Sequence, residues 1–155
     1  MTTLSSLTAD DHDDWLSLWW GYLEFYEAEL TTAQTEFTFA RLIDPADAVC
    51  GAIARDHAGR GVGLVHWLTH PSTWSVGPYC YLEDLFVHPD ARGSGTGAAL
   101  IEHVRAWAAD TGCDKVYWLT QRGNHKAREL YDRVATDTGF VHYEIDLAPT
   151  APGAV

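Results

Sequence analysis

The chain has little positive charge and no long hydrophobic run. Ten Lys and Arg residues stand against 22 Asp and Glu residues, which gives a formal net charge of −12 over 155 residues. Nucleic-acid binding requires a basic surface, so we expect no nucleic-acid partner. No apolar run approaches the ~20 residues of a membrane span, and the N-terminus lacks the basic and apolar regions of a secretory signal. We therefore expect a cytoplasmic protein with no membrane partner.

Cysteine is scarce. Cys50, Cys80 and Cys113 are odd in number, widely spaced and without a CxxC pair. This usage favours a reducing compartment with buried thiols, and we expect Cys80 to belong to the core rather than to act as a nucleophile.

Length and composition indicate one globular domain. Hydrophobic residues make up 46% of the chain and charged residues 21%, and 155 residues can bury a sizeable core. We expect a single domain over residues 1–147. Residues 148–155, rich in Ala, Pro and Gly, are expected to form a flexible tail.

The charges are unevenly distributed. No Lys or Arg precedes Arg41, whereas seven of the ten basic residues lie at or after Arg92. Eight acids precede Arg41: Asp10, Asp11, Asp13, Asp14, Glu24, Glu27, Glu29 and Glu36. A cationic ligand near the N-terminal half and an anionic one near the C-terminal half would suit this polarity, although a solvated acidic surface would explain it equally well.

Hydrophobic periodicity and turn residues predict the order strand, two helices, three strands, helix, strand, helix, strand. The expected segments are 2–7, 8–30, 32–42, 48–54, 62–69, 79–88, 95–110, 116–120, a helix capped by Asn124 that ends before Gly139, and 140–146.

The first of these helices is unusually aromatic. It carries six aromatic residues: Trp15, Trp19, Trp20, Tyr22, Phe25 and Tyr26. They are too many for one narrow stripe, so part of this surface should face something other than the helix's own sheet. Core packing, a substrate wall and a dimer contact are the alternatives, and we expect a homodimer.

Residues 81–97 (YLEDLFVHPDARGSGTG) are the most informative stretch. A strand-like run with two acids breaks at Pro89, and Arg92 leads into glycines at every second position before a helix begins. Glycines let the backbone approach a ligand and permit positive φ, while the helix presents its positive end at the same point. This arrangement favours a diphosphate held on backbone N–H groups without a metal.

Two other phosphate-binding loops fit less well. A P-loop needs a Gly-Lys pair, and the chain contains none. Residues 93–98 satisfy GxGxxG/A formally, but residues 88–92 separate strand from glycines where a dinucleotide-binding fold needs a tight turn. A purely structural glycine turn remains as a third reading.

Residues 92–97 match the R/Q-x-x-G-x-G/A signature, and the chain thereby resembles the GNAT acetyltransferase superfamily. Asn124, Ala127, Leu130 and Tyr131, followed by Gly139, resemble its second motif. The resemblance covers roughly residues 48–146. The YLEDLFV and YWLT runs are most similar to the branch that contains spermidine/spermine, histone, polyamine and D-amino-acid acetyltransferases.

The resemblance implies an α/β (α+β) fold with a mixed, mostly antiparallel twisted sheet flanked by helices, and acetyl-CoA as cosubstrate. Backbone groups of Phe86 and Val87 would pair with the pantetheine amides, and Asn124 would bond the same arm. Lys126 or Arg128 would meet cofactor phosphates, and two solvated helix charges are the alternative for this pair. The phosphate loop would comprise Arg92, Gly93, Ser94, Gly95, Thr96, Gly97 and Ala98.

The resemblance also implies roles for two catalytic side chains. Glu83 would take the proton of the attacking amine, and Tyr131 would protonate the departing thiolate. Asp84 points to the opposite face of a regular strand, so it would bind substrate only if a bulge re-aimed it. Trp20, Glu24 and Glu27 are the other expected acceptor contacts.

We expect no metal centre. His66 and His70 share a strand face without a third ligand at metal spacing, so both are interpreted as ordinary strand histidines. The resulting hypothesis is direct acetyl transfer in a ternary complex to a primary amine: a polyamine, an amino acid or another small cationic amine. The alternatives are a protein lysine or histone acetyltransferase, a non-catalytic acyl-CoA sensor, and an interaction protein that dimerises through the aromatic helix.

Overall fold

The computed structural model describes residues 2–147, and the chain forms two compact units, Met1–Thr120 and Gln121–Val155. The tail expected at 148–155 lies outside the described residues.

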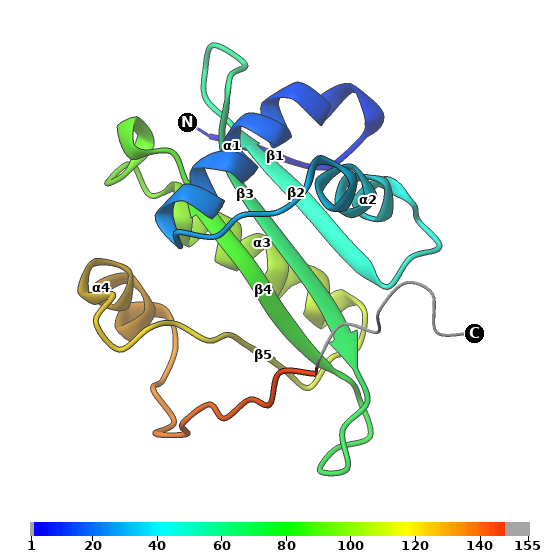
Figure 1. Cartoon of the computed structure of the whole chain (residues 1–155). Coiled ribbons are helices and arrows are strands. Elements are labelled where there is room, and N and C mark those ends of the chain that lie inside the picture. Colours follow the sequence, from blue (N-terminus) through cyan, green and yellow to red (C-terminus); the bar gives the residue numbers. More distant parts are fainter. Residues whose placement is uncertain (1, 148–155) are drawn as a thin grey trace. The chain divides into compact units, whose positions relative to one another are not determined.

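The first unit is built on a five-stranded sheet in the order β1-β2-β3-β4-β5 (Figure 1). Neighbouring strands from β1 to β4 are antiparallel, whereas β4 and β5 are parallel. The strands are β1 (Thr3–Ser6), β2 (Val49–Arg55), β3 (Gly61–His70), β4 (Tyr79–Val87) and β5 (Lys115–Tyr117). The expected mixed, mostly antiparallel sheet is confirmed.

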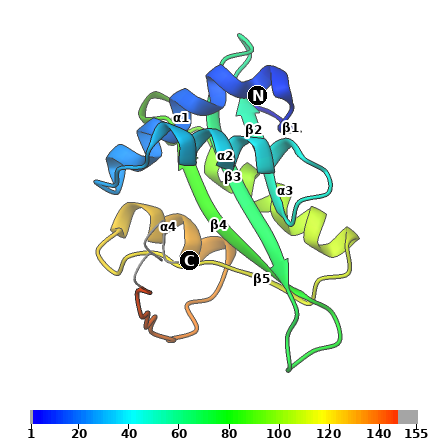
Figure 2. The same cartoon turned by 45° about the vertical axis from the view of Figure 1, so that its right-hand side comes forward.

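Helices cover both faces of this sheet. Helices α1 (His12–Phe25) and α2 (Thr32–Ile43) lie on one face and α3 (Thr96–Asp110) on the other, as Figures 1 and 2 show. The α1 side holds the larger apolar cluster, in which Trp15 and Trp19 pack with Leu64 and Phe86. On the opposite face, Trp67 of β3 makes an edge contact with Trp107 of α3.

A capping box precedes α1. Thr8 caps a short 3-10 turn (η1, Ala9–Asp11) that leads into the helix, and the carboxylate of Asp11, its last residue, accepts hydrogen bonds from the Thr8 N–H and hydroxyl at 2.8 Å each. The Thr8-x-x-Asp11 spacing is typical of such a box.

The end of α1 differs from the prediction, because the helix stops at Phe25 rather than near residue 30. Glu27 adopts a left-handed φ of 52°, its N–H bonds to the Glu24 carbonyl, and the Ala28 N–H bonds to the Leu23 carbonyl. These two bonds form a Schellman motif, which closes a helix and is usually built on glycine. Glutamate at that position gives no sequence signal for the stop.

The second unit contains α4 (His125–Val134), which confirms the helix expected after Asn124, although it ends at Val134. The strand predicted over 140–146 is wrong: residues 136–147 have no regular secondary structure. A strand requires a hydrogen-bonded neighbour, and within residues 2–147 none pairs with this segment. Its apolar side chains are exposed, with Phe140 at 89% and Ile145 at 89%.

Candidate active site

Strand β4 contains a bulge at the two adjacent acids. His66 of β3 lies opposite Asp84, but the next residue, Trp67, lies opposite Leu82, so Glu83 is an extra residue on β4. A bulge of this kind bends the strand and re-aims side chains. The bulge that Asp84 needs in order to face the substrate site is therefore present.

The bulge changes which face of the sheet the β4 side chains occupy. Leu82 lies opposite Trp67 on the α3 face, whereas Phe86, four residues later, lies opposite Leu64 and packs beneath α1. Asp84 shares the α1 face through its pairing with His66, which contacts Trp15. Both carboxylates of the Glu83–Asp84 pair consequently lie toward α1.

Glu83 has the electrostatics of a base. Its side chain is exposed, yet desolvation by the surrounding protein, followed by the negative charge of Asp84, raises the pKa of its carboxyl above the ordinary value of 4.5. Arg41 and His66 oppose this shift. A carboxylate with a raised pKa is a stronger proton acceptor at neutral pH.

Asp84 is held by a histidine of the neighbouring strand. Nδ1 of His66 lies 2.9 Å from its Oδ2, and the Tyr22 hydroxyl of α1 lies within range of its negative charge. Burial, and then the negative charge of Asp84, raises the pKa of Tyr22. The sequence does not reveal the partners of His66, which it indicates to be an ordinary strand histidine; its contacts with Trp15 and Asp84 are seen only in the structure. The available signal was a lone histidine inside the otherwise apolar run of β3.

Tyrosines surround the two acids. Tyr26 packs on Tyr22 at 4.9 Å between ring centroids, and Tyr81 stacks on Tyr117 at 5.0 Å. The negative charge of Asp84 adds to burial in raising the pKa of both Tyr26 and Tyr81. Aromatic rings beside carboxylates form a surface that attracts cations.

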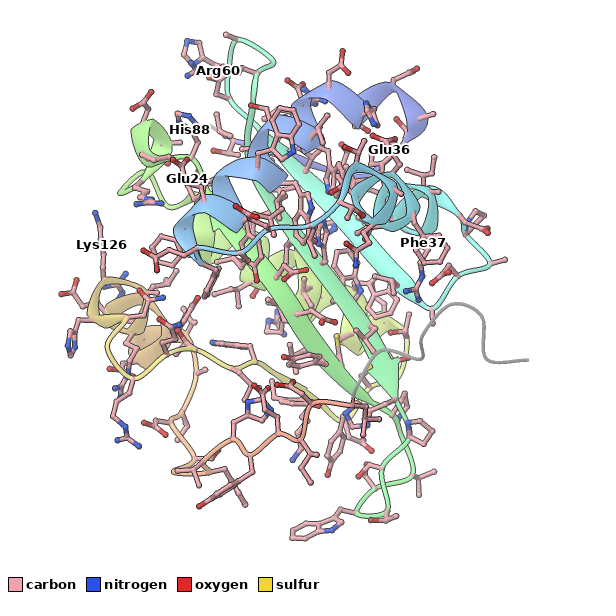
Figure 3. The ribbon with its side chains drawn as sticks, in the orientation of Figure 1. Glu24, Glu36, Phe37, Arg60, His88 and Lys126 are labelled. Carbon is pink, nitrogen blue, oxygen red and sulfur yellow. The ribbon has the colours of Figure 1, made fainter. Side chains whose placement is uncertain are left out.

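The other expected acceptor residues lie elsewhere on α1 and just after it. Trp20 is 60% exposed, and Glu24 and Glu27 are also exposed; Figure 3 shows Glu24 on this helix. Asp84 is hydrogen-bonded by His66 rather than by any of these three residues. Their role in substrate binding stays a prediction.

Strands β4 and β5 separate beside the acids. They pair from Tyr79 opposite Lys115 to Tyr81 opposite Tyr117, after which β5 ends and β4 continues to Val87. Within the described chain no strand pairs with this edge of β4 beyond Tyr81. Such an edge can bond an extended ligand in the manner of an added strand.

Phe86 and Val87, the expected pantetheine contacts, lie on this stretch. The Phe86 ring is 6% exposed and belongs to the core, which leaves only its backbone for a ligand. The Val87 carbonyl already accepts a 3.1 Å hydrogen bond from Nε of Arg92, whose guanidinium carbon lies 5.9 Å from the Phe86 ring centroid.

The glycine loop has the backbone that a phosphate site needs. Gly93 and Gly95 have φ of 80° and 87°, and a Cβ built on either would meet no atom within 4 Å. The loop therefore borders open space. Gly95 also occupies the N-cap position of α3 and, as a glycine, makes no side-chain cap bond there. Ser94 and Thr96 brace the loop through a 2.9 Å contact between their hydroxyls.

Three expected site residues belong to the second unit. Tyr131 lies on α4, partly buried, and Asn124 occupies the N-cap position without a side-chain cap bond. Arg128 donates to the Arg122 carbonyl and to Asp137, both at 3.2 Å. Lys126 projects from the same helix (Figure 3). The roles of Tyr131, Asn124 and Arg128 stay predictions.

Two further features concern the described residues 2–147. They contain no cluster of three or more His, Cys, Asp or Glu side chains arranged to hold a metal. None of their helices is both long and apolar enough to span a membrane.

Comparison with known proteins shows the family to which the chain belongs. The model of the acetyltransferase (GNAT) family matches residues 12–135. D-amino-acid N-acetyltransferase HPA3 of Saccharomyces cerevisiae is 37% identical over 142 residues, covering 91% of this chain and 88% of the relative. Thialysine N-epsilon-acetyltransferase of Sus scrofa is 39% identical over 71 residues, covering 46% of this chain and 40% of the relative.

A solved structure shares the fold. It is that of the aminoglycoside N-acetyltransferase AAC(6')-Iy, determined with the bisubstrate analog CoA-S-monomethyl-acetylneamine. The two structures have a TM-score of 0.82 at 17% sequence identity, and the match covers 96% of this chain and 99% of that enzyme's chain. The relatives are consistent with the polyamine and D-amino-acid branch that the sequence resembles. The chain belongs to the acetyltransferase (GNAT) family and is an N-acetyltransferase.

Proposed function

We propose that this enzyme transfers the acetyl group of acetyl-CoA to a primary amine that is cationic in solution, by direct attack within a ternary complex. The bulge in β4 is the observation that carries the proposal, because it sets Glu83 and Asp84 together beside a ring of tyrosines. We further propose that the enzyme acts in the cytoplasm as a homodimer.

Acetyl-CoA is the acetyl donor of this family, and the loop at residues 92–98 suits its diphosphate. Two glycines with positive φ border open space, and the α3 N-terminus brings a positive dipole to the same point. From Glu83 to Val87, β4 spans about 13 Å at roughly 3.3 Å per residue. Its unpaired edge can therefore guide the extended arm from the loop toward the acids.

The acceptor amine must lose a proton before it can attack. An alkyl ammonium with a pKa near ~10.4 needs roughly 4–5 kcal/mol to reach its neutral form at pH 7. Glu83 accepts this proton, directly or through water, and its raised pKa improves that transfer. Asp84 and the neighbouring tyrosines hold the cationic form beforehand.

The departing thiolate requires an acid, and Tyr131 is assigned this role. Its place on α4 after Asn124 matches the family's second motif. A tyrosine hydroxyl is a proton donor and can supply that proton.

Direct attack is favoured over an acetylated cysteine. Cys80, on β4, is fully buried, and this burial raises the pKa of its thiol to about 12. A neutral, inaccessible thiol is a poor nucleophile.

An assay of a panel of amines tests the proposal. Spermidine, lysine-containing peptides and D- and L-amino acids are each supplied with acetyl-CoA, and free thiol is measured. We expect turnover with a cationic amine and a loss of about 10²–10⁴ in kcat for Glu83→Gln. Tyr131→Phe should also lower kcat. CoA binding with no thiol release from any amine would instead identify an acyl-CoA sensor.

An amino-acid acceptor is the second candidate. Arg41 is a cation whose charge reaches Glu83, and its guanidinium is paired with Asp47 at 3.0 and 3.1 Å. It could bind the carboxylate of an amino acid, the substrate class named for the yeast relative. Arg41→Gln should then raise KM for amino acids and leave KM for polyamines unchanged. Acetylation of peptides alone would point to a protein lysine acetyltransferase.

A further inference from the structure

A histidine is buried in the middle of β3, beneath the aromatic helix. His66 is 1% exposed, and the Trp19 ring lies 5.3 Å from its own between centroids. A polar ring in such a place is costly unless both nitrogens are bonded. Nε2 lies 2.9 Å from Nε1 of Trp15, and Nδ1 lies 2.9 Å from Oδ2 of Asp84.

These two contacts fix the tautomer of His66. The indole N–H of Trp15 can only donate, so Nε2 of His66 must accept and carries no proton. The imidazole proton therefore lies on Nδ1 and is donated to Asp84. Trp15 thus sets the direction of the whole chain of hydrogen bonds, which ends at a carboxylate of the active site.

The same carboxylate still reaches solvent. The Asp84 side chain is 15% exposed, whereas the side chain of His66 is 2% exposed. The Nδ1–H of His66 therefore holds Asp84 from the protein side and leaves it open to a ligand. The Tyr22 hydroxyl of α1 lies within range of the Asp84 charge.

The neighbouring Glu83 explains why Asp84 needs to be held in one position. The negative charge of Asp84 adds to desolvation in raising the pKa of Glu83, so the two carboxylates repel each other. Unrestrained, Asp84 could rotate away from its neighbour. The hydrogen bond from His66 keeps it beside Glu83, where an incoming cation relieves the repulsion.

We propose that His66 is a positioning residue for amine recognition: locked by Trp15 as the Nδ1–H tautomer, it holds Asp84 as the docking carboxylate for the acceptor's ammonium group. This inference rests on the proposed function, since it assigns a recognition role within that same site. His66 does not contact the reacting atoms, so its loss should weaken amine binding more than it slows the chemical step.

Two substitutions separate this role from simple core packing. Gln can present an acceptor near the position of Nε2 but offers no donor at Nδ1, whereas Asn can present an amide N–H near Nδ1 and loses the bond to Trp15. His66→Gln therefore breaks the link to Asp84 and His66→Asn keeps it. Each variant removes one buried hydrogen bond, so we expect similar losses in Tm.

The test measures binding of spermidine in the presence of CoA by calorimetry, alongside steady-state KM and kcat. We expect His66→Gln to weaken spermidine binding and raise the amine KM by about tenfold or more, with KM for acetyl-CoA unchanged. His66→Asn should stay within about threefold of the parent.

His70→Gln provides a matched control on the same strand, because its ring bonds Tyr117 and the Pro71 carbonyl rather than an acid. Equal weakening in the Gln and Asn variants of His66, or none in either, would overturn the positioning role. If the parent binds spermidine without acetylating any amine, the proposed function fails, and the Gln-to-Asn difference in binding still decides the role of His66.

Discussion

Glu83 and Asp84 are adjacent acids whose surroundings differ. Asp84 is hydrogen-bonded by His66, while desolvation and the charge of Asp84 raise the pKa of the exposed Glu83. Neighbouring carboxylates with different environments commonly have different catalytic roles within one site. Here one is suited to hold a cation and the other to take its proton.

The raised pKa of Glu83 has opposite effects on activity and stability. Because the folded protein binds this proton more tightly than the unfolded chain, ionisation of Glu83 lowers stability as pH rises from about 4.5 through the folded-state pKa. Glu83→Gln should therefore remove the acidic limb of the kcat–pH profile and raise Tm slightly at neutral pH. The gain is small because the side chain is exposed.

Glu102→Gln is the control for that experiment, since Glu102 lies on α3 and pairs with Arg105 at 2.6 Å. It should leave the kcat–pH profile unchanged. A Glu83→Gln enzyme that keeps both its rate and its acidic limb would remove Glu83 from the mechanism.

At the scale of elements, α1 approaches β4 closely because Gly21 has no side chain. A Cβ at this position would lie 2.8 Å from Cζ of Phe86, whose ring is packed in the core. The same approach brings Tyr22 to Asp84. The spacing of α1 and β4 therefore couples core packing to the active site.

Gly21→Ala should destabilise the protein although alanine favours helices by about 1 kcal/mol. Overpacking costs roughly 1–3 kcal/mol, so we expect a net loss of about 1 kcal/mol and a fall in Tm of about 2–4 °C by calorimetry. Ser17→Ala, at an exposed position of the same helix, should leave Tm equal or higher. An unchanged Tm for Gly21→Ala would mean that Phe86 shifts freely.

The sequence predicts an element correctly where a few neighbouring residues determine it. It fails where strand pairing or an unusual backbone conformation determines the structure. The capping box at Thr8 and the glycines before α3 are encoded by residue type, and both are found. The stop at Glu27 is hidden because glutamate rarely takes a left-handed conformation. The role of His66 depends on contacts with residues 51 and 18 positions away, which spacing cannot reveal.

At the scale of the whole molecule, the acidic composition should act on the substrate from a distance. The net charge of −12 and the absence of Lys or Arg before Arg41 place negative charge along the segment that contains α1 and α2. Such a field draws cationic ligands toward the protein and is screened by salt, with a Debye length of about 30 Å at 0.01 M and about 8 Å at 0.15 M.

Raising the ionic strength from 0.01 to 0.15 M should therefore increase KM for spermidine several-fold, because the acids attract a multiply charged amine less strongly. Initial rates at saturating acetyl-CoA measure this effect. An amine that is neutral at the assay pH, such as an aromatic amine, serves as the comparison and should show little change. Equal salt dependence for both amines would contradict electrostatic steering.

The extra residue in β4 also reverses the alternation of its side chains between the two faces of the sheet. Before Glu83, even-numbered side chains such as Cys80 and Leu82 face α3; after it, the even-numbered Phe86 faces α1. Deleting one residue here would restore simple alternation and turn one half of the strand inside out. Insertions and deletions in β4 should thus be tolerated far less well than substitutions. Their main effect should be loss of folding rather than a change in specificity.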